Sequence, residues 1–210
     1  MLDYLVTADQ PEPEIIAQAA DVLRRGGVVA YPTDTLYGLA VDPRSGDAVA
    51  RLYAAKGRGQ QSAIPLIAAS LEQAQGAAIL DGLALQLARA FWPGPLPIVA
   101  PPERGLAAAV LGGGTTVAVR VPAHAVARAL AAAFGFCITA TSANRSGESP
   151  AVTGADVAAA FATGSDVDVL LDAGLVTGGP PSTIVEIGAD GPRLIRAGVV
   201  PWNRVLESLK

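Results

Sequence analysis

Segments with a helical spacing of apolar residues alternate along this chain with short runs of β-branched and other apolar residues. The helical spacing predicts helices near 11–25, 46–55, 71–78, 82–91, 124–133 and 153–162. The apolar runs predict strands near 28–31, 64–68, 96–100, 116–121, 136–140, 167–171, 183–187 and 193–197. Interleaved strands and helices of this kind are typical of the α/β class, with a twisted and mixed sheet.

Capping and breaking residues support these boundaries. The first helix begins at a run of prolines and acids, Pro11 to Glu14, and ends with two arginines before Gly26. Ser45 and Thr153 are suited to cap the helices that follow them. Neither an internal repeat nor a linker is visible, so we expect residues 1–210 to form a single domain.

Composition limits the class of protein. The chain has 210 residues, of which 51% are hydrophobic and 16% are charged, so it can bury a substantial core. A net charge of −4 argues against a surface covered in positive potential for nucleic acid. The single cysteine, Cys137, lies in an apolar segment and excludes an internal disulfide framework. Since neither a signal peptide nor an apolar run of membrane-spanning length is visible, we expect a cytoplasmic protein with no membrane partner.

The use of cations singles out one position. Of 15 basic residues only Lys56 and Lys210 are lysines, and Lys56 stands in Lys56-Gly57-Arg58 at the exit of a predicted helix. Lysine provides a compact point charge that arginine does not replace where phosphate is bound. This contrast makes Lys56 a candidate binding residue.

Several mechanisms are excluded by the residues that the chain lacks. Its only histidine is His124. The chain therefore cannot combine a Ser-His or Cys-His nucleophile with a metal site that uses a second histidine. We interpret His124 and Cys137 as structural. Neither a P-loop nor a Rossmann fingerprint occurs. The run from Gly112 to Thr116 is either a close approach to phosphate or an ordinary mobile turn.

The remaining candidates are cations and hydroxyls that follow apolar strands, where α/β folds bind ligands. They are Thr33, Thr35, Lys56, Arg58, Arg120, Ser142, Asn144, Ser182, Thr183 and Arg196. This set suits a reaction that needs positioning and charge neutralisation more than proton abstraction. Phosphoryl and nucleotidyl transfer are reactions of this kind.

Seven short motifs, in order and at characteristic spacing, resemble those of one family. They are Tyr31-Pro32-Thr33-Asp34-Thr35 with Tyr37-Gly38-Leu39, Lys56-Gly57-Arg58, Trp92-Pro93-Gly94-Pro95, Val119-Arg120-Val121-Pro122, Ser142-Ala143-Asn144-Arg145-Ser146-Gly147, Ser182-Thr183-Ile184-Val185 and Arg196-Ala197-Gly198. Together they resemble the YrdC/TsaC family of threonylcarbamoyl-AMP synthases, over about residues 26–198.

The resemblance implies a fold and a reaction. The fold would be a YrdC-like open, twisted, mixed sheet with flanking helices around a large, positively lined cavity. The chain would be the short form, without the additional C-terminal domain of longer members. The reaction would convert L-threonine, bicarbonate and ATP, with Mg²⁺ accompanying the ATP, into threonylcarbamoyl-AMP and pyrophosphate. Partner proteins would then transfer the threonylcarbamoyl group to the tRNA adenosine beside the anticodon.

The resemblance also implies roles for single residues. Lys56 and Arg58 would be catalytic and would contact the phosphates of ATP. Nucleotide binding would involve these two with Ser62, Thr116, Asn144 and Arg196. Threonine or its carbamate would be held by Thr35, Arg120, Ser142 and Ser182. No residue is expected to form a metal site.

The chain departs from the family pattern at Gly59–Ile64 and at Pro97. Two alternatives therefore stay open. One is a divergent paralogue that adenylates another carbamoyl donor, as in hydrogenase-maturation carbamoyltransferases, although their further modules are missing here. The other is a module that binds double-stranded RNA without synthase activity, although an isoelectric point near 4.9 suits at most a weak RNA contact.

Overall fold

The computed structural model describes residues 1–57, 59, 61–162, 164, 166–188 and 190–210. Its helices agree closely with the sequence prediction, apart from a short additional helix at the C-terminus. They are α1 (Pro13–Arg24), α2 (Gly46–Lys56), α3 (Leu71–Gln75), α4 (Gly82–Phe91), α5 (Ala125–Phe134), α6 (Gly154–Ala160) and α7 (Trp202–Glu207), with a 3-10 turn η1 (Ala108–Leu111).

The predicted caps form as expected. Each is made by residues next to the helix end, so the sequence nearby determines where these helices begin and end. Ser45 Oγ accepts a hydrogen bond from Ala48 N at 3.2 Å and so begins α2. Gly57 ends the same helix in the left-handed region, with φ of 61°. Thr153 and Asp156 cap each other's main-chain N–H groups at the start of α6.

The first sheet has the strand order β1-β9-β2-β3-β8. Its strands are β1 (Leu2–Leu5), β2 (Val29–Pro32), β3 (Tyr37–Ala40), β8 (Thr141–Ser142) and β9 (Val169–Asp172). β9 runs parallel to both β1 and β2, whereas β3 is antiparallel to β2 and β8.

The second sheet has the order β11-β10-β5-β6-β4-β7. Its strands are β4 (Leu66–Ile67), β5 (Ile98–Ala100), β6 (Val117–Arg120), β7 (Ile138–Thr139), β10 (Ile184–Gly188) and β11 (Gly191–Arg196). Both parallel pairs (β10 with β5, β4 with β6) and antiparallel pairs occur.

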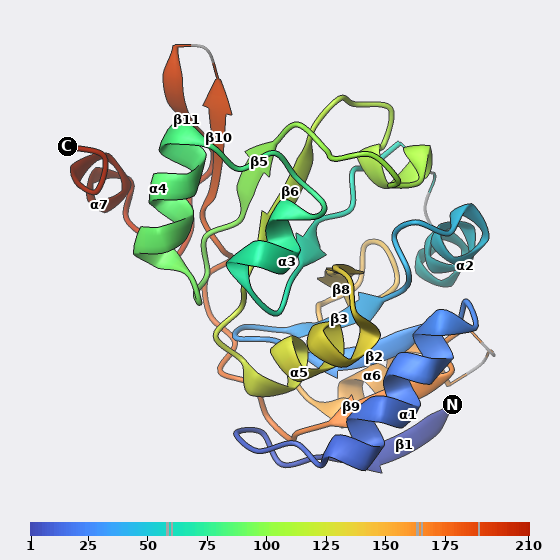
Figure 1. The fold of residues 1–210 in the computed structure, drawn as a ribbon. Coiled ribbons are helices and arrows are strands. Elements are labelled where there is room, and N and C mark those ends of the chain that lie inside the picture. The colour runs from blue at the N-terminus through green and yellow to red at the C-terminus, as the bar shows by residue number, and fades with distance from the viewer. Residues whose placement is uncertain (58, 60, 163, 165, 189) are drawn as a thin grey trace.

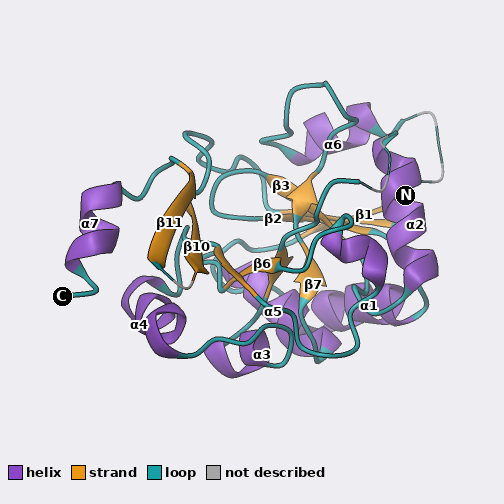
Figure 2. Ribbon diagram, turned by 90° about the horizontal axis from the view of Figure 1, so that it is seen from above, coloured by secondary structure: helices purple, strands orange, loops and turns teal. Residues whose placement is uncertain are grey.

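The two sheets form two halves of the molecule, the first below and the second above in Figure 1. Helices α1 and α5 pack on each other and on β2, whereas α4 packs on β5. The N-terminus at β1 and the C-terminus after α7 lie on opposite sides of the molecule in Figure 2. One buried apolar cluster reaches from Leu39 in the first sheet to Leu66 and Ile98 in the second.

The mixed α/β class predicted from the sequence is confirmed, but the structure has two sheets where we expected one. The predicted strand at 136–140 shows the reason. Ile138–Thr139 pairs with β4 in the second sheet, and Thr141–Ser142 pairs with β3 in the first. The chain therefore passes from one sheet to the other at Ala140. Sequence analysis also missed the edge strand β1 and the fully buried β3.

In the part of the chain that the structure describes, none of the helices combines the length and the apolar character that crossing a bilayer requires.

Candidate functional site

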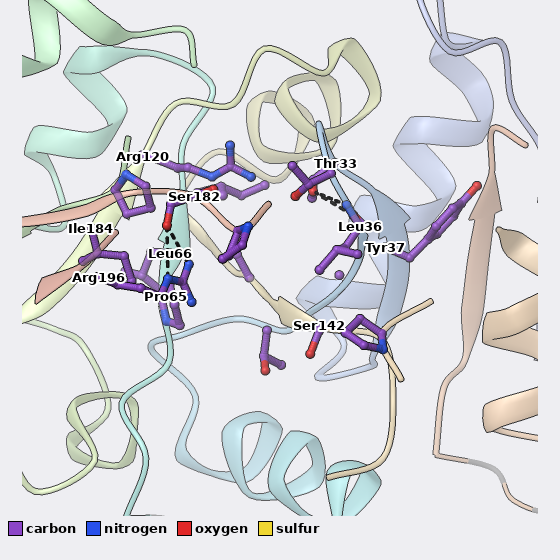
Figure 3. Close-up of a pocket in the computed structure, with 18 of the residues that line it drawn as sticks. Thr33, Leu36, Tyr37, Pro65, Leu66, Arg120, Ser142, Ser182, Ile184 and Arg196 are labelled. Carbon is purple, nitrogen blue, oxygen red and sulfur yellow. Dashed lines mark hydrogen bonds between the residues drawn. The ribbon is translucent and has the colours of Figure 1, made fainter. Parts of the chain in front are cut away.

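A pocket of about 400 Å³ opens between the two sheets, and both contribute to its wall (Figure 3). Ser142 of the first sheet and Arg120, Ile184 and Arg196 of the second all line it. Residues with aliphatic hydroxyls gather there: Thr33, Thr35, Thr141, Ser142 and Ser182. No carboxylate occurs among the described residues of this lining.

The turn between β2 and β3 places two threonines at the pocket. Thr33 donates hydrogen bonds to Leu36 O from its main-chain N, at 3.0 Å, and from its Oγ1, at 2.7 Å. These bonds close a short turn over residues 33–36, which contributes Thr33, Thr35 and Leu36 to the lining. Pro32 ends the strand before it and so favours a turn at this point.

Arg120 stands at the end of β6 and carries the main charge of one wall. Its Nη1 donates to Asp34 Oδ2 at 2.5 Å and lies 3.4 Å from Gly94 O. The two side chains are only 9% and 16% exposed, so the pair is poorly screened by water. The contact joins the 33–36 turn of the first sheet to a strand of the second.

Arg196 ends β11 on the wall that Ser182 also forms. Its Nε and Nη2 donate to Ser182 O at 3.1 and 3.0 Å. Partial burial lowers the pKa of Arg196, because desolvation disfavours the charged form. Arginine nevertheless stays protonated, so this wall keeps a positive charge.

Lys56 lies behind Ser142 and is 3% exposed. Its ammonium donates to Ser142 O at 2.5 Å and to Asn144 O at 2.8 Å, and lies 3.3 Å from Asn144 Oδ1. Its own carbonyl accepts from Ser146 N at 2.9 Å. An ammonium has three donors, and here they point at one loop. In this geometry Lys56 fixes the 142–146 loop and does not line the pocket.

Asn144 reinforces the same loop. Its Nδ2 donates to Arg145 O at 2.9 Å and to Glu148 O at 2.8 Å, while Oδ1 faces Lys56. Asn144 is 7% exposed. Its amide therefore holds the loop that presents Ser142.

The structure thus brings together half of the residues singled out by sequence. Six line the pocket: Thr33, Thr35, Arg120, Ser142, Ser182 and Arg196. Lys56 and Asn144 support it from behind, whereas Ser62 is exposed and Thr116 precedes β6, both outside the lining. Arg58 lies outside the described residues. A large, positively lined cavity stays a prediction, because among the described residues two cations line this pocket and one of them is ion-paired.

Sequence reasoning missed the partner of Arg120. Asp34 belongs to the motif at residues 31–35, and the sequence alone assigns it no role. The apolar floor formed by Pro65, Leu66 and Ile67 was also missed as a site feature. A buried arginine is stabilised by a carboxylate partner, and an aspartate in the turn after a buried strand could have indicated that partner from the sequence.

His124 and Cys137 lie outside the lining, as their structural interpretation requires. His124 is the N-cap of α5, and burial lowers its pKa. Cys137 is fully buried, and burial raises the pKa of its thiol to about 12. A thiol with so high a pKa is a poor nucleophile.

The described residues contain no group of three or more His, Cys, Asp or Glu side chains arranged to hold a metal ion. In the described part of the lining, the side-chain donors are hydroxyls and two arginines. Such a lining fits a Mg²⁺ that arrives on nucleotide phosphates with its own waters, since Mg²⁺ in such sites is held mainly by substrate oxygens. Chemically, the pocket can bind and neutralise anions, and its described lining offers no carboxylate base.

Comparison with known proteins gives a consistent picture. A family model described as telomere recombination, which covers the Sua5, YciO and YrdC proteins, matches residues 21–198. The threonylcarbamoyl-AMP synthase of Halorhodospira halophila is 43% identical over 185 residues, 88% of this chain and 95% of that protein. The threonylcarbamoyl-AMP synthase of Thiobacillus denitrificans is 42% identical over 178 residues, 83% of this chain and 91% of that protein.

Solved structures agree with the fold. Sua5 of P. abyssi, complexed with L-threonine, matches with a TM-score of 0.92 and 33% identity. The match covers all of this chain but 61% of that longer protein. YciO of E. coli matches with a TM-score of 0.84 over 96% of this chain and 98% of that one, and its 24% identity shows a shared fold alone.

Proposed function

This chain belongs to the Sua5, YciO and YrdC family, and we propose that it synthesises threonylcarbamoyl-AMP from L-threonine, bicarbonate and ATP. It is then a transferase of the nucleotidyltransferase kind that acts in tRNA modification. Its product supplies the threonylcarbamoyl group of the tRNA adenosine beside the anticodon. The observation that carries the proposal is 43% identity along 95% of the length of a synthase.

The chemistry needs two steps whose demands the pocket meets. The threonine ammonium first releases a proton to solvent; the neutral amine then adds to the carbon of bicarbonate, with loss of water, and gives a carbamate. A carbamate oxygen then attacks the α-phosphorus of ATP, and the bond to the β-phosphate oxygen breaks to release pyrophosphate. The nucleophile is already anionic, so the absence of a carboxylate from the described lining is no obstacle.

What the site must supply is proximity and charge neutralisation. Holding reactants in line can contribute roughly 7–11 kcal/mol in favourable cases. Carbamate and triphosphate repel each other, and the cations Arg120 and Arg196, which both line the pocket, reduce that repulsion.

The roles of single residues are part of the proposal. Thr35, Arg120, Ser142 and Ser182 hold threonine and its carbamate, and Arg196 faces the nucleotide. Ser62, Thr116 and Arg58 contact the nucleotide. Lys56 and Asn144 act through the 142–146 loop, as their hydrogen bonds support.

Other components follow from the reaction. Mg²⁺ enters as part of the Mg·ATP substrate. Transfer to tRNA is made by partner proteins, with at most weak direct contact of this chain to RNA, and the protein works in the cytoplasm. The paralogue and RNA-module alternatives lack an observation that favours them: the matching HypF chain is 21% identical, which shows the fold alone.

The test is release of pyrophosphate from ATP and bicarbonate with L-threonine, L-serine or no amino acid. We expect threonine-dependent release in the unaltered protein. Arg196→Ala should raise KM for ATP by about tenfold or more, the effect of losing one charged hydrogen-bond donor. Release independent of any amino acid, or none at all, would contradict the proposed synthase.

A matched control lies on the same strand. Arg193 of β11 is exposed, pairs with Glu186 and is not part of the pocket lining. Arg193→Ala removes the same charge from β11, so its KM for ATP should stay within about twofold of the unaltered value. An equal effect of both substitutions would mean that net charge, and not the pocket, determines ATP binding.

A further inference from the structure

Three segments of the pocket meet at one acidic residue, Asp34. Its Oδ2 accepts from Arg120 Nη1 at 2.5 Å, and its main-chain oxygen accepts from Thr177 Oγ1 at 2.6 Å. Arg120 belongs to β6 of the second sheet, and Thr177 lies in the loop of residues 173–183 that leads from β9 to β10. That loop also carries Ser182, which lines the pocket.

The contact with Arg120 is buried enough to fix the guanidinium. Asp34 and Arg120 side chains are 16% and 9% exposed, and a hydrogen bond between opposite charges is among the stronger ones in proteins. Arginine has five N–H donors, and the described contacts of Arg120 use Nη1. The other donors are left for a ligand in the pocket that Arg120 lines.

The conformational freedom that the Arg120 side chain would lose on ligand binding is an entropic cost. A long side chain that must be ordered when a ligand binds lowers affinity, and one already held in place does not. Asp34 itself is not part of the lining, so its carboxylate acts on a ligand only through Arg120. Thr177 in turn anchors the 173–183 loop to the 33–36 turn.

We propose that Asp34 is a positioning residue, which orients Arg120 toward the bound amino acid and ties the 173–183 loop to the edge of the pocket. The inference rests on the proposed function, in which Arg120 holds threonine or its carbamate. Asp34 contributes to the binding of the amino acid, whereas ATP binding depends on other residues of the pocket, such as Arg196.

The test is steady-state pyrophosphate release by Asp34→Asn, which keeps the shape and removes the charge. KM for L-threonine should rise about tenfold, the effect of losing one charge-assisted hydrogen bond, with kcat and KM for ATP within about twofold. Asp42→Asn is the control, because Asp42 pairs with Arg44 outside the pocket lining. It should leave KM for threonine unchanged.

A double-mutant cycle separates positioning from a general structural role. If Asp34 acts through Arg120, the Asp34→Asn change should add no further loss in an Arg120→Gln protein. Independent effects that multiply, or a KM for threonine that is unchanged or lowered in Asp34→Asn, would overturn the proposal.

The loop contact has a readout that does not require synthase activity. Thr177→Val removes the hydroxyl that binds Asp34 O, so hydrogen exchange of residues 174–182 in the ligand-free protein should accelerate severalfold. An unchanged rate of hydrogen exchange would overturn the proposed anchoring of the 173–183 loop by Asp34. An unaltered protein without threonine-dependent release would instead overturn the proposed function, and the exchange result would stand apart from it.

Discussion

At the residue scale, Lys56 shows how the tertiary structure assigns contacts that the sequence cannot reveal. As the only internal lysine it was a candidate for phosphate binding, yet its ammonium is buried and bonds the carbonyls of Ser142 and Asn144. Three tetrahedral donors on a slender stem suit converging carbonyls, whereas the planar fork of arginine does not. The compact positive charge of Lys56 holds the 142–146 loop in place.

Lys56→Met should therefore reduce stability as well as activity. Methionine is similar in length but cannot donate, so two loop carbonyls lose a charged partner and the free energy of unfolding should fall by about 2–3 kcal/mol. Urea denaturation of the ligand-free protein measures this loss. Threonine-dependent turnover should fall too, because the loop presents Ser142 to the pocket.

Arg104→Met, at an exposed cation, is the control and should leave the unfolding free energy within about 0.5 kcal/mol of the original. If Lys56→Met were equally harmless to stability but abolished ATP binding, Lys56 would be a phosphate contact after all.

At the element scale, β11 can approach the Ser182 segment only because residue 198 is glycine. A Cβ atom there would lie 2.1 Å from Pro181 O and 2.5 Å from Ser182 C. The approach is held by a hydrogen bond from Val199 N to Pro181 O at 3.0 Å. It keeps Arg196 within reach of Ser182 O, so the glycine serves the pocket wall.

Gly198→Ala should push these segments apart. We expect a loss of about 1–3 kcal/mol in the free energy of unfolding, as for other overpacked sites, together with a raised KM for ATP. Chemical denaturation and the pyrophosphate assay measure the two effects. Gly46→Ala is the matched control: it opens α2 with nothing within 4 Å of a new Cβ, so stability should be equal or slightly higher. Similar losses in both variants would contradict the close-approach argument.

At the scale of the whole molecule, the two sheets share their main apolar cluster. Leu39 of β3, Leu66 of β4 and Ile98 of β5 belong to it, so neither half buries its core alone. We propose on this ground that residues 1–210 form a single domain.

The domain proposal predicts one cooperative unfolding transition. The two tryptophans, Trp92 and Trp202, follow α4 and begin α7, beside the second sheet, so their fluorescence reports that half. Far-UV circular dichroism reports helices of both halves. The two urea curves should coincide, as they do for two-state domains. An earlier fluorescence transition would mean that the halves unfold separately.

What the sequence alone determined is local or linear. Caps at Ser45 and Thr153, glycine stops, the α/β class and the order of seven motifs could all be predicted, because each depends on neighbours in the chain. Only the tertiary structure decided which sheet each half of 136–142 joins, that Asp34 pairs with Arg120 and that Lys56 bonds Ser142. Both of these pairs are 86 residues apart in sequence. Such contacts depend on how the sheets are placed against each other, and no local preference encodes that placement.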